Sequence, residues 1–568
     1  MKLKYVVALA ATALAAPASA DTFVDNVDGI TLDERGNVQR FTGFIVDEDG
    51  TILRVLDERS KRPKRKEIEF HVDGDGRVVV PGMIDSHVHL LDLGLAQLTL
   101  DLGEARSLDD ALTRIQSFSQ NSQGRSWLLG GGWNQENWGL ARFPTAAELD
   151  AVTGARPAWL MRVDGHAGWA NSAALKAAGI TANTPDPAGG RIERDASGAP
   201  TGVLVDAAME LMAPSVPKPR PIDEDNAFVR AQRLLLENGV TAVGDMGTTI
   251  QEWQTYRRAG DKGNLRLRIA AYAAGVEAMQ LIGGPGPTPW LYDDRLRLNG
   301  VKLYMDGALG SRGAWLKAPY ADAPETRGLP LLTDTQLGNL MSRASFDDFQ
   351  IAVHAIGDKA NSSVLSAIEE LAQTYKGDRR WRIEHAQVFD PADIARLNGL
   401  GVIASMQPQH QTSDRLMAEA RLGPNRLVGA YAWKSVLATG TPLAFGSDAP
   451  VEPPRPFWGL AAATTRQDAS GQPVGGWQPQ ERLTRAEALA GYTTGAAYSL
   501  QAEGKIGRIA PGLQADFLFL DRDPLRVPPA ELWQTRVLET WIGGKRAWKQ
   551  GDAMPDEAGQ RAIDSFGR

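Results

Sequence analysis

The amino-acid sequence predicts an α/β fold: a (β/α)8 TIM barrel, with a small β-sandwich domain from both chain ends and a large insertion after the first barrel strand. In the middle of the chain, apolar strand-like runs alternate with helical stretches, which is typical of a parallel sheet flanked by helices. Short apolar runs separated by turn clusters lie at both ends. About 150 residues separate the first two candidate strands, far more than a normal strand-to-helix connection needs.

Eight apolar runs are predicted as the barrel strands. In chain order they are 79–90, 241–246, 267–274, 300–305, 350–356, 381–387, 402–406 and 442–445. A helix is expected after most of them, and residues 361–375 are the clearest candidate. Active sites of such barrels lie at the carboxyl ends of the strands, so the chemistry is expected where these runs end.

The predicted boundaries follow from these runs. We expect a signal peptide at 1–20 and the amino-terminal part of the β-sandwich domain at 21–78. The barrel is expected at 79–504, with an inserted subdomain at about 91–225. Residues 505–568 would complete the β-sandwich domain.

The amino terminus has the three parts of a secretory signal. Lys2 and Lys4 precede an apolar run at 5–16, and Ala18-Ser19-Ala20 is a small-x-small cleavage site. The apolar run is too short to span a bilayer comfortably. We therefore expect cleavage after Ala20 and a periplasmic or secreted protein without a membrane span.

Composition narrows the classes of function. The chain has 568 residues, 43% of them hydrophobic and 23% charged, with a net charge of -8. These values are typical of a soluble globular protein and argue against a nucleic-acid partner. The chain contains no cysteine, which excludes disulfides, thiolate metal ligands and a cysteine nucleophile.

The most informative local pattern is His87-Val88-His89, at the end of the first predicted strand. Side chains alternate between the two faces of a strand, so residues two apart point the same way. Both imidazoles can therefore reach one metal ion. Alone, this motif is weak.

Other polar residues mark the ends of later predicted strands. Lys302 lies inside an apolar strand, and His354, His385 and Asp448 each follow or end one. Each also has a structural explanation when taken singly: a paired strand lysine, buried core histidines or a helix N-cap aspartate. Their order along the chain favours one shared metal site.

In this pattern the chain resembles the amidohydrolase superfamily of metal-dependent hydrolases, and within it the amidohydrolase-3 group that contains N-substituted formamide deformylase. The supporting motifs are Gly132-Trp133-Asn134-Gln135, Asp164-Gly165-His166, Val301-Lys302-Leu303, Asp306-Gly307-Ala308-Leu309-Gly310-Ser311-Arg312, His354-Ala355-Ile356-Gly357-Asp358, Arg382-Ile383-Glu384-His385 and Gly446-Ser447-Asp448. They span nearly the whole chain after residue 20.

The resemblance implies a role for each residue of the site. His87 and His89 would bind one metal, His354 and His385 a second, and an N-carboxylated Lys302 would bridge the two. The divalent metal would be zinc, two per chain, with one as the alternative. Metal-bound water ionises near neutral pH, and the resulting hydroxide would attack the carbonyl carbon of an amide, N-acyl or N-formyl group, whose C–N bond then breaks. Asp448 would contact the metal and shuttle the proton to the leaving nitrogen.

Five further residues are expected to contact the small-molecule substrate. They are His166, Arg312, His410, Asp306 and Trp133, which lie near predicted strand ends or in the insertion. The insertion is expected to act as a lid over the site.

The sequence leaves the cleaved bond open. A deaminase, a cyclic amidase, or an esterase or lactonase could use the same metal site, because the pocket rather than the metal selects the bond. A non-catalytic periplasmic binding protein is the remote alternative. A homodimer is the assembly that the resemblance implies.

Overall fold

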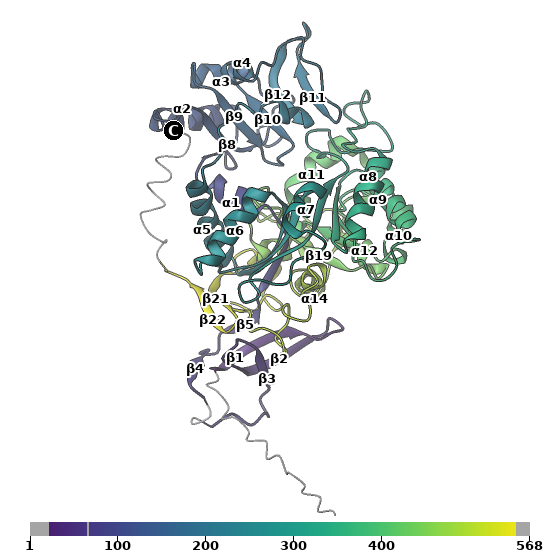
Figure 1. The fold of residues 1–568 in the computed structure, drawn as a ribbon. Coiled ribbons are helices and arrows are strands. Elements are labelled where there is room, and N and C mark those ends of the chain that lie inside the picture. Colours follow the sequence, from purple (N-terminus) through teal and green to yellow (C-terminus); the bar gives the residue numbers. More distant parts are fainter. Residues whose placement is uncertain (1–21, 65–67, 553–568) are drawn as a thin grey trace, which may run out of the picture.

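The computed structural model describes residues 22–64 and 68–552. The predicted signal peptide and its cleavage site after Ala20 lie outside the described residues. In the described part of the chain, the strands form three sheets: a parallel barrel, a sheet built from both ends of the chain, and a sheet within the insertion. Figure 1 shows the insertion above the barrel and the sheet of the two chain ends below it.

The predicted eight-stranded parallel barrel is confirmed. Neighbouring strands pair in parallel from first to last. A bridge between Val88 of the first strand and Ala449, just after the last strand, brings the ring close to closure. The strands are β6 (Met83–Val88), β13 (Val240–Thr248), β14 (Arg268–Ala274), β15 (Leu296–Tyr304), β16 (Gln350–Ala355), β17 (Arg382–His385), β18 (Ile403–Met406) and β19 (Leu443–Phe445). Almost every residue of these strands is buried, as expected for a sheet covered on both faces.

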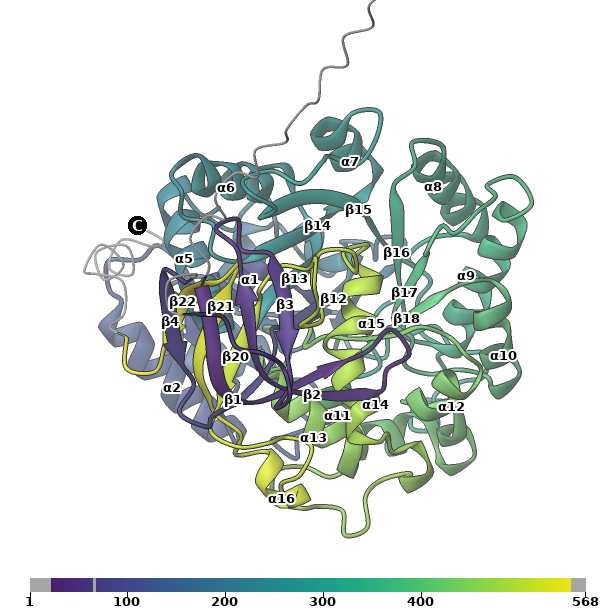
Figure 2. The ribbon, with the colours of Figure 1, turned by 90° about the horizontal axis from the view of Figure 1, so that it is seen from below.

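Helices surround the ring of strands, and Figure 2 shows α7 to α10 outside β14 to β18. The helix predicted at 361–375 is α9 (Asp358–Leu371), whose apolar residues Val364, Leu365 and Ile368 are buried. The other helices of this part are α1 (Leu90–Ala96), α5 (Pro221–Glu237), α6 (Ile250–Asp261), α7 (Gly275–Gly283), α8 (Asp334–Phe346), α10 (Pro391–Gly399), α11 (Pro408–Leu422), α12 (Trp433–Ala438), α13 (Pro456–Thr465), α14 (Arg485–Gly491) and α15 (Thr494–Ser499).

The first predicted strand, 79–90, is in fact two strands in two different sheets. β5 (Val78–Pro81) pairs with strands from the chain ends, and only β6 belongs to the barrel. The chain changes sheets at Gly82, where a Cβ would lie 2.3 Å from the Thr241 hydroxyl oxygen. A continuous apolar run fits either sheet, so the sequence pattern could not reveal this break.

Strands from the two chain ends form one eight-stranded sheet. Its members are β1 (Thr22–Leu32), β2 (Val38–Val46), β3 (Ile52–Leu56), β4 (Phe70–Asp73), β5, β20 (Phe517–Leu520), β21 (Val537–Ile542) and β22 (Lys545–Lys549). The short helix α16 (Pro529–Leu532) lies between β20 and β21. The buried pair between Arg268 of the barrel and Asp516, with Nε to Oδ2 at 2.7 Å, joins this sheet to the barrel.

Between β6 and β13 the chain forms a separate six-stranded sheet. It contains β7 (Leu100–Asp101), β8 (Leu128–Trp133), β9 (Ala158–Arg162), β10 (Ala167–Ala170), β11 (Gly190–Arg194) and β12 (Pro200–Asp206), with helices α2 (Leu108–Asn121), α3 (Ala146–Thr153) and α4 (Ser172–Ala177). This sheet has its own buried apolar cluster around Trp133 and Trp169. Among the described helices, none combines the length and the apolar character that crossing a membrane requires.

Candidate metal centre

The closure of the barrel brings three predicted ligands together. His87 lies in β6, and the backbone N–H of Asp448 donates to the His87 carbonyl oxygen at 2.7 Å. The buried Asp85 carboxylate accepts hydrogen bonds from the backbone N–H of Ser447 at 2.8 Å and from its hydroxyl at 2.5 Å. These contacts between the first and last strands fix Asp448 beside His87 and His89.

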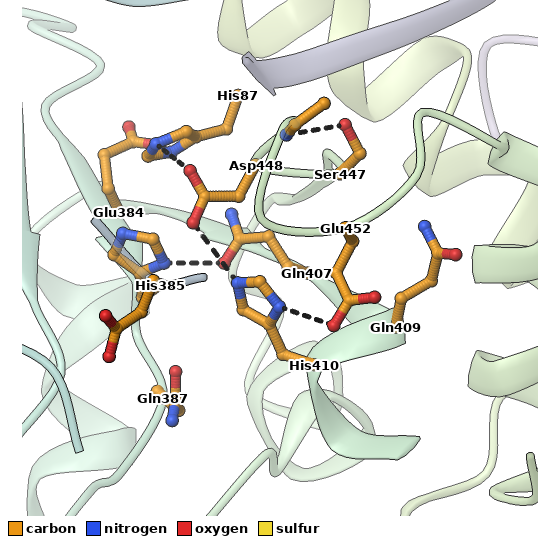
Figure 3. A network of polar contacts seen from close by, with 12 residues as sticks. His87, Glu384, His385, Gln387, Gln407, Gln409, His410, Ser447, Asp448 and Glu452 are labelled. Carbon is orange, nitrogen blue, oxygen red and sulfur yellow. Dashed lines mark hydrogen bonds and ion pairs between the residues drawn. The ribbon is translucent and has the colours of Figure 1, made fainter. Parts of the chain in front are cut away.

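The Asp448 carboxylate lies among imidazole nitrogens (Figure 3). Its Oδ1 is 3.2 Å from Nε2 of both His87 and His89 and has no hydrogen-bond partner in the described part of the chain, although it is buried. Burial alone would raise the pKa of Asp448, but His87 and the other imidazoles hold it well below its usual range. One atom each of His87, His385 and Asp448 lies within 4.8 Å of the others. Such a set of donors around an unsatisfied carboxylate oxygen fits a divalent cation.

A buried carboxylate orients His87. Its Nδ1 donates to Oε2 of Glu384 at 2.7 Å, which leaves Nε2 free to face Asp448. Arg382 in turn donates to both oxygens of Glu384, at 2.7 and 3.0 Å, and all three side chains are fully buried. Burial would raise the pKa of Glu384, but Arg382 and His87 hold it far below its usual range. An ionised carboxylate behind the ring is the partner that metal-binding histidines usually have.

The other two predicted histidine ligands lie on the neighbouring strands β16 and β17, offset by one register position. His385 follows Glu384, and its Nδ1 donates to the side-chain oxygen of Gln407 at 2.9 Å. Nε2 of His354 lies 3.5 Å from the Gly307 carbonyl oxygen, and the rings of His354 and His385 are 4.5 Å apart. Burial lowers the pKa of both imidazoles well below the usual value, so both are neutral, as metal ligands must be.

Lys302 points into the same space from β15. Its Nζ is 3.3 Å from Nε2 of His87 and lies over the ring of Tyr304, with 4.9 Å to the ring centroid. Lys302 is only 1% exposed, and burial lowers its pKa to about 8. About a tenth of the amine is therefore neutral at pH 7, far more than for an exposed lysine.

His410 approaches Asp448 from the side opposite His87. Its Nε2 is 3.3 Å from Oδ2 of Asp448 and its Nδ1 is 3.4 Å from Glu452 (Figure 3). Burial would lower the pKa of His410, but these two carboxylates raise it to about 10. The structure thus brings His410 together with the six predicted metal ligands.

His166 and Asp306 are also near this cluster, in different ways. The ring of His166, from the insertion, lies 5.0 Å from that of His354. Asp306 is fully buried and accepts hydrogen bonds from the backbone N–H groups of Trp315, Ile356 and Gly357, at 2.8 to 3.0 Å. Both carboxylate oxygens thus hold backbone N–H groups, and Oδ1 also lies 3.6 Å from Nε2 of His354.

The contacts that the structure gives for Arg312 and Trp133 are with residues outside the cluster. The Arg312 guanidinium pairs with Asp322 at 2.9 Å, in the loop that follows β15. Trp133 is fully buried in the insertion, where its Nε1 donates to the Leu160 carbonyl oxygen at 2.7 Å. Trp133 therefore packs the core of the insertion, and its expected substrate contact stays a prediction.

Sequence reasoning missed three residues that contact the site. Glu384 and Gln407 orient His87 and His385, and Asp206 binds Nδ1 of His166 at 2.7 Å. Glu384 directly precedes His385, and a strand carboxylate at that position could have indicated a histidine partner. The position of Asp206, 40 residues from His166, left no such signal.

Comparisons with known proteins agree with this geometry. The model of the amidohydrolase family matches residues 71–547. The putative amidohydrolase YtcJ of Bacillus subtilis (strain 168) is 35% identical over 519 residues, which cover 89% of this chain and 95% of that protein. N-substituted formamide deformylase of Arthrobacter pascens is 29% identical over 537 residues, covering 92% and 97%. The crystal structure of an uncharacterized metal-dependent hydrolase from Pyrococcus horikoshii OT3 matches with a TM-score of 0.73 and 28% identity, covering 90% of this chain and 99% of that one.

Proposed function

This chain belongs to the amidohydrolase family and is a metal-dependent hydrolase, and from that premise we propose that it cuts a carbon–nitrogen bond in an amide, N-acyl or N-formyl compound. Two relatives support this choice of bond, since one is a putative amidohydrolase and another is an N-substituted formamide deformylase. The observation that carries the proposal is Asp448 Oδ1, a buried carboxylate oxygen without a hydrogen bond between two imidazole nitrogens.

We propose that two zinc ions bind here. The proposed ligands are His87, His89, Lys302 as its carbamate, His354, His385 and Asp448. Imidazole and carboxylate donors suit zinc, and the neutral amine that carbamate formation needs is favoured by the burial of Lys302. When bound, the metal would acidify water and polarise the substrate carbonyl.

Side chains of the site would carry out the proton transfer and keep the reacting groups in position. The Asp448 carboxylate would take a proton from the attacking water and deliver it to the leaving nitrogen, so that the amine departs neutral. His410 would hold the Asp448 carboxylate in place through its contact with Oδ2. His87 and His385 would stay fixed because Glu384 and Gln407 engage their Nδ1 atoms.

Hydrolysis of paired test compounds checks this function. 4-Nitroformanilide and 4-nitroacetanilide release 4-nitroaniline, which is followed by absorbance, and 4-nitrophenyl acetate serves as the ester. We expect turnover of at least one anilide and a loss of about 10²- to 10⁴-fold in Asp448→Asn, because a positioned proton acceptor contributes on that scale. Asp195→Asn, in an exposed turn of the insertion, is the matched control.

The outcomes separate the candidate functions. Turnover of the ester alone would replace the C–N proposal with an esterase. An Asp448→Asn variant that keeps both its metal and its full turnover would refute the proposed proton transfer. Wild-type protein with bound metal and no turnover of any compound would contradict the proposed substrate class.

We also propose that the protein is exported and cleaved after Ala20. Lys2 and Lys4, the apolar run at 5–16 and the small residues before the cleavage site support this.

A further inference from the structure

We propose that the insertion supplies a substrate-contacting residue, His166, and that Asp206 is the positioning residue that presents its Nε2 to the acyl part of the substrate. This inference rests on the proposed function and adds a contact on the His354 side of the site. In this account the insertion is part of the reaction chamber rather than a simple cover.

The fold of the insertion delivers the two residues as a unit. His166 lies in the turn between β9 and β10, and Asp206 is the last residue of β12, the antiparallel neighbour of β10. The backbone N–H of Asp206 donates to the His166 carbonyl oxygen at 3.0 Å. The side chains then meet again, with Nδ1 of His166 2.7 Å from Oδ1 of Asp206. Backbone and side chain therefore both fix the ring.

The Asp206 carboxylate is enclosed in an unusual way. Its side chain is fully buried, and its backbone has a positive φ of 50°, which is uncommon for a residue other than glycine. Gly307 and Gly313 pack against it so closely that a Cβ on either would lie within 2.4 Å of its Oδ2. Two glycines thus make room for this carboxylate under the loop after β15.

The Asp206 carboxylate makes few other polar contacts in the described part of the chain. In the described part of the chain, the Asp206 side chain has His166 as its hydrogen-bond partner, and its Oδ2 has none. Burying a carboxylate with an unsatisfied oxygen is unfavourable, so a purely structural role gains little from it. Orientation of His166 accounts for the position.

One ring nitrogen of His166 is available for contact with a ligand. Nδ1 is engaged by Asp206, whereas Nε2 makes no hydrogen bond to any described residue. The His166 side chain keeps 17% of its surface exposed, compared with 2% for His354. Its ring nevertheless lies 5.0 Å from that of His354, a proposed metal ligand. A partly exposed imidazole with an unengaged nitrogen, beside the metal site, is placed to contact a bound substrate.

The position of His166 also selects which part of the substrate it meets. Asp448, which would serve the leaving nitrogen, contacts His87, His89 and His410. His166 instead contacts His354. The polar group that reaches His166 is then on the acyl side of the bond.

A double-mutant cycle tests the inference. Turnover of 4-nitroformanilide and 4-nitroacetanilide is measured for wild type, His166→Ala, Asp206→Ala, Asp206→Asn and the double alanine variant, with Asp195→Asn as control. We expect kcat/KM to fall about 100-fold in His166→Ala and about 30-fold in Asp206→Ala, mainly through kcat. The double variant should be no worse than His166→Ala, because Asp206 acts through that ring. Asp206→Asn keeps an acceptor for Nδ1 and should lose less than Asp206→Ala.

Metal content and thermal unfolding of each variant accompany the kinetics. Unchanged metal content with coupled kinetic losses supports the inference. The inference would be overturned if the kcat/KM of the double variant fell by the product of the two single losses, or if His166→Ala kept full activity. Either result would leave the proposed function intact. If Asp206→Ala does not fold, a fully active Asp206→Asn/His166→Ala pair overturns it instead. Absence of wild-type hydrolysis, in contrast, overturns the proposed function itself and this inference with it.

Discussion

Glu384→Gln tests how the protein prepares His87 for a metal. The carboxylate accepts one hydrogen bond from His87 at 2.7 Å and two from Arg382 at 2.7 and 3.0 Å, with all three groups fully buried. The amide keeps one acceptor oxygen but loses the charge and turns an NH₂ group toward a donor. The variant therefore perturbs both the orientation of His87 and the buried ion pair.

The two effects have different sizes. Loss of a partner behind a metal-binding histidine weakens metal affinity by about 10- to 100-fold, or about 1.4 to 2.7 kcal/mol. Removing one member of a buried ion pair lowers the free energy of unfolding by about 3–5 kcal/mol. The loss of stability should disappear when Arg382 is also replaced, whereas the loss of metal affinity should remain.

Metal affinity is measured by titration with chelator-buffered zinc, and stability by urea denaturation of the metal-free protein. We expect Glu384→Gln to lower both the metal affinity and the stability of the protein. The double variant Arg382→Met/Glu384→Gln should regain most of the stability without regaining metal affinity. Wild-type metal affinity in a folded Glu384→Gln protein would refute the reasoning that this carboxylate orients a ligand.

Three further predictions concern the two sheets, the loop over Asp206 and the amino terminus. Arg268→Met should lower the free energy of unfolding by about 3–5 kcal/mol in urea denaturation, because it leaves the Asp516 carboxylate buried without its charged partner. The double variant Arg268→Met/Asp516→Leu should recover most of this loss, and a double variant as unstable as Arg268→Met would contradict the prediction. Gly307→Ala places a Cβ within 2.4 Å of Asp206 Oδ2, so the kcat of the variant should fall while its metal content stays at the wild-type value. A wild-type kcat would contradict this, because it would show that the loop tolerates the methyl group. Edman sequencing of the exported protein should begin at Asp21, and an intact Met1 would rule out cleavage after Ala20.

The sequence was sufficient for the barrel because the strand signals are local. Apolar runs of strand length, separated by helical stretches, predicted all eight strands, and polar residues at their ends predicted that His87, His354 and Asp448 converge. The bounds of the first strand, 79–90, were wrong, because this apolar run is divided between two sheets and the change at Gly82 depends on packing against Thr241.

Contacts that arise only from tertiary structure could not be predicted. The pairing of His166 with Asp206 depends on the register of β10 and β12 within the insertion. The burial of Trp133 likewise depends on how the insertion packs, since a tryptophan after a glycine run fits a pocket wall and a core equally well. Side-chain partners across long sequence separations therefore needed the structure.

The most direct test of a metal centre formed by the barrel ends is the metal stoichiometry of the mature protein. Elemental mass spectrometry is carried out on protein beginning at Asp21 and purified without chelators. About two metal ions per chain is the predicted result, and about one would remove the bridging role of Lys302. No metal, even after addition of zinc or manganese with bicarbonate, would contradict the account.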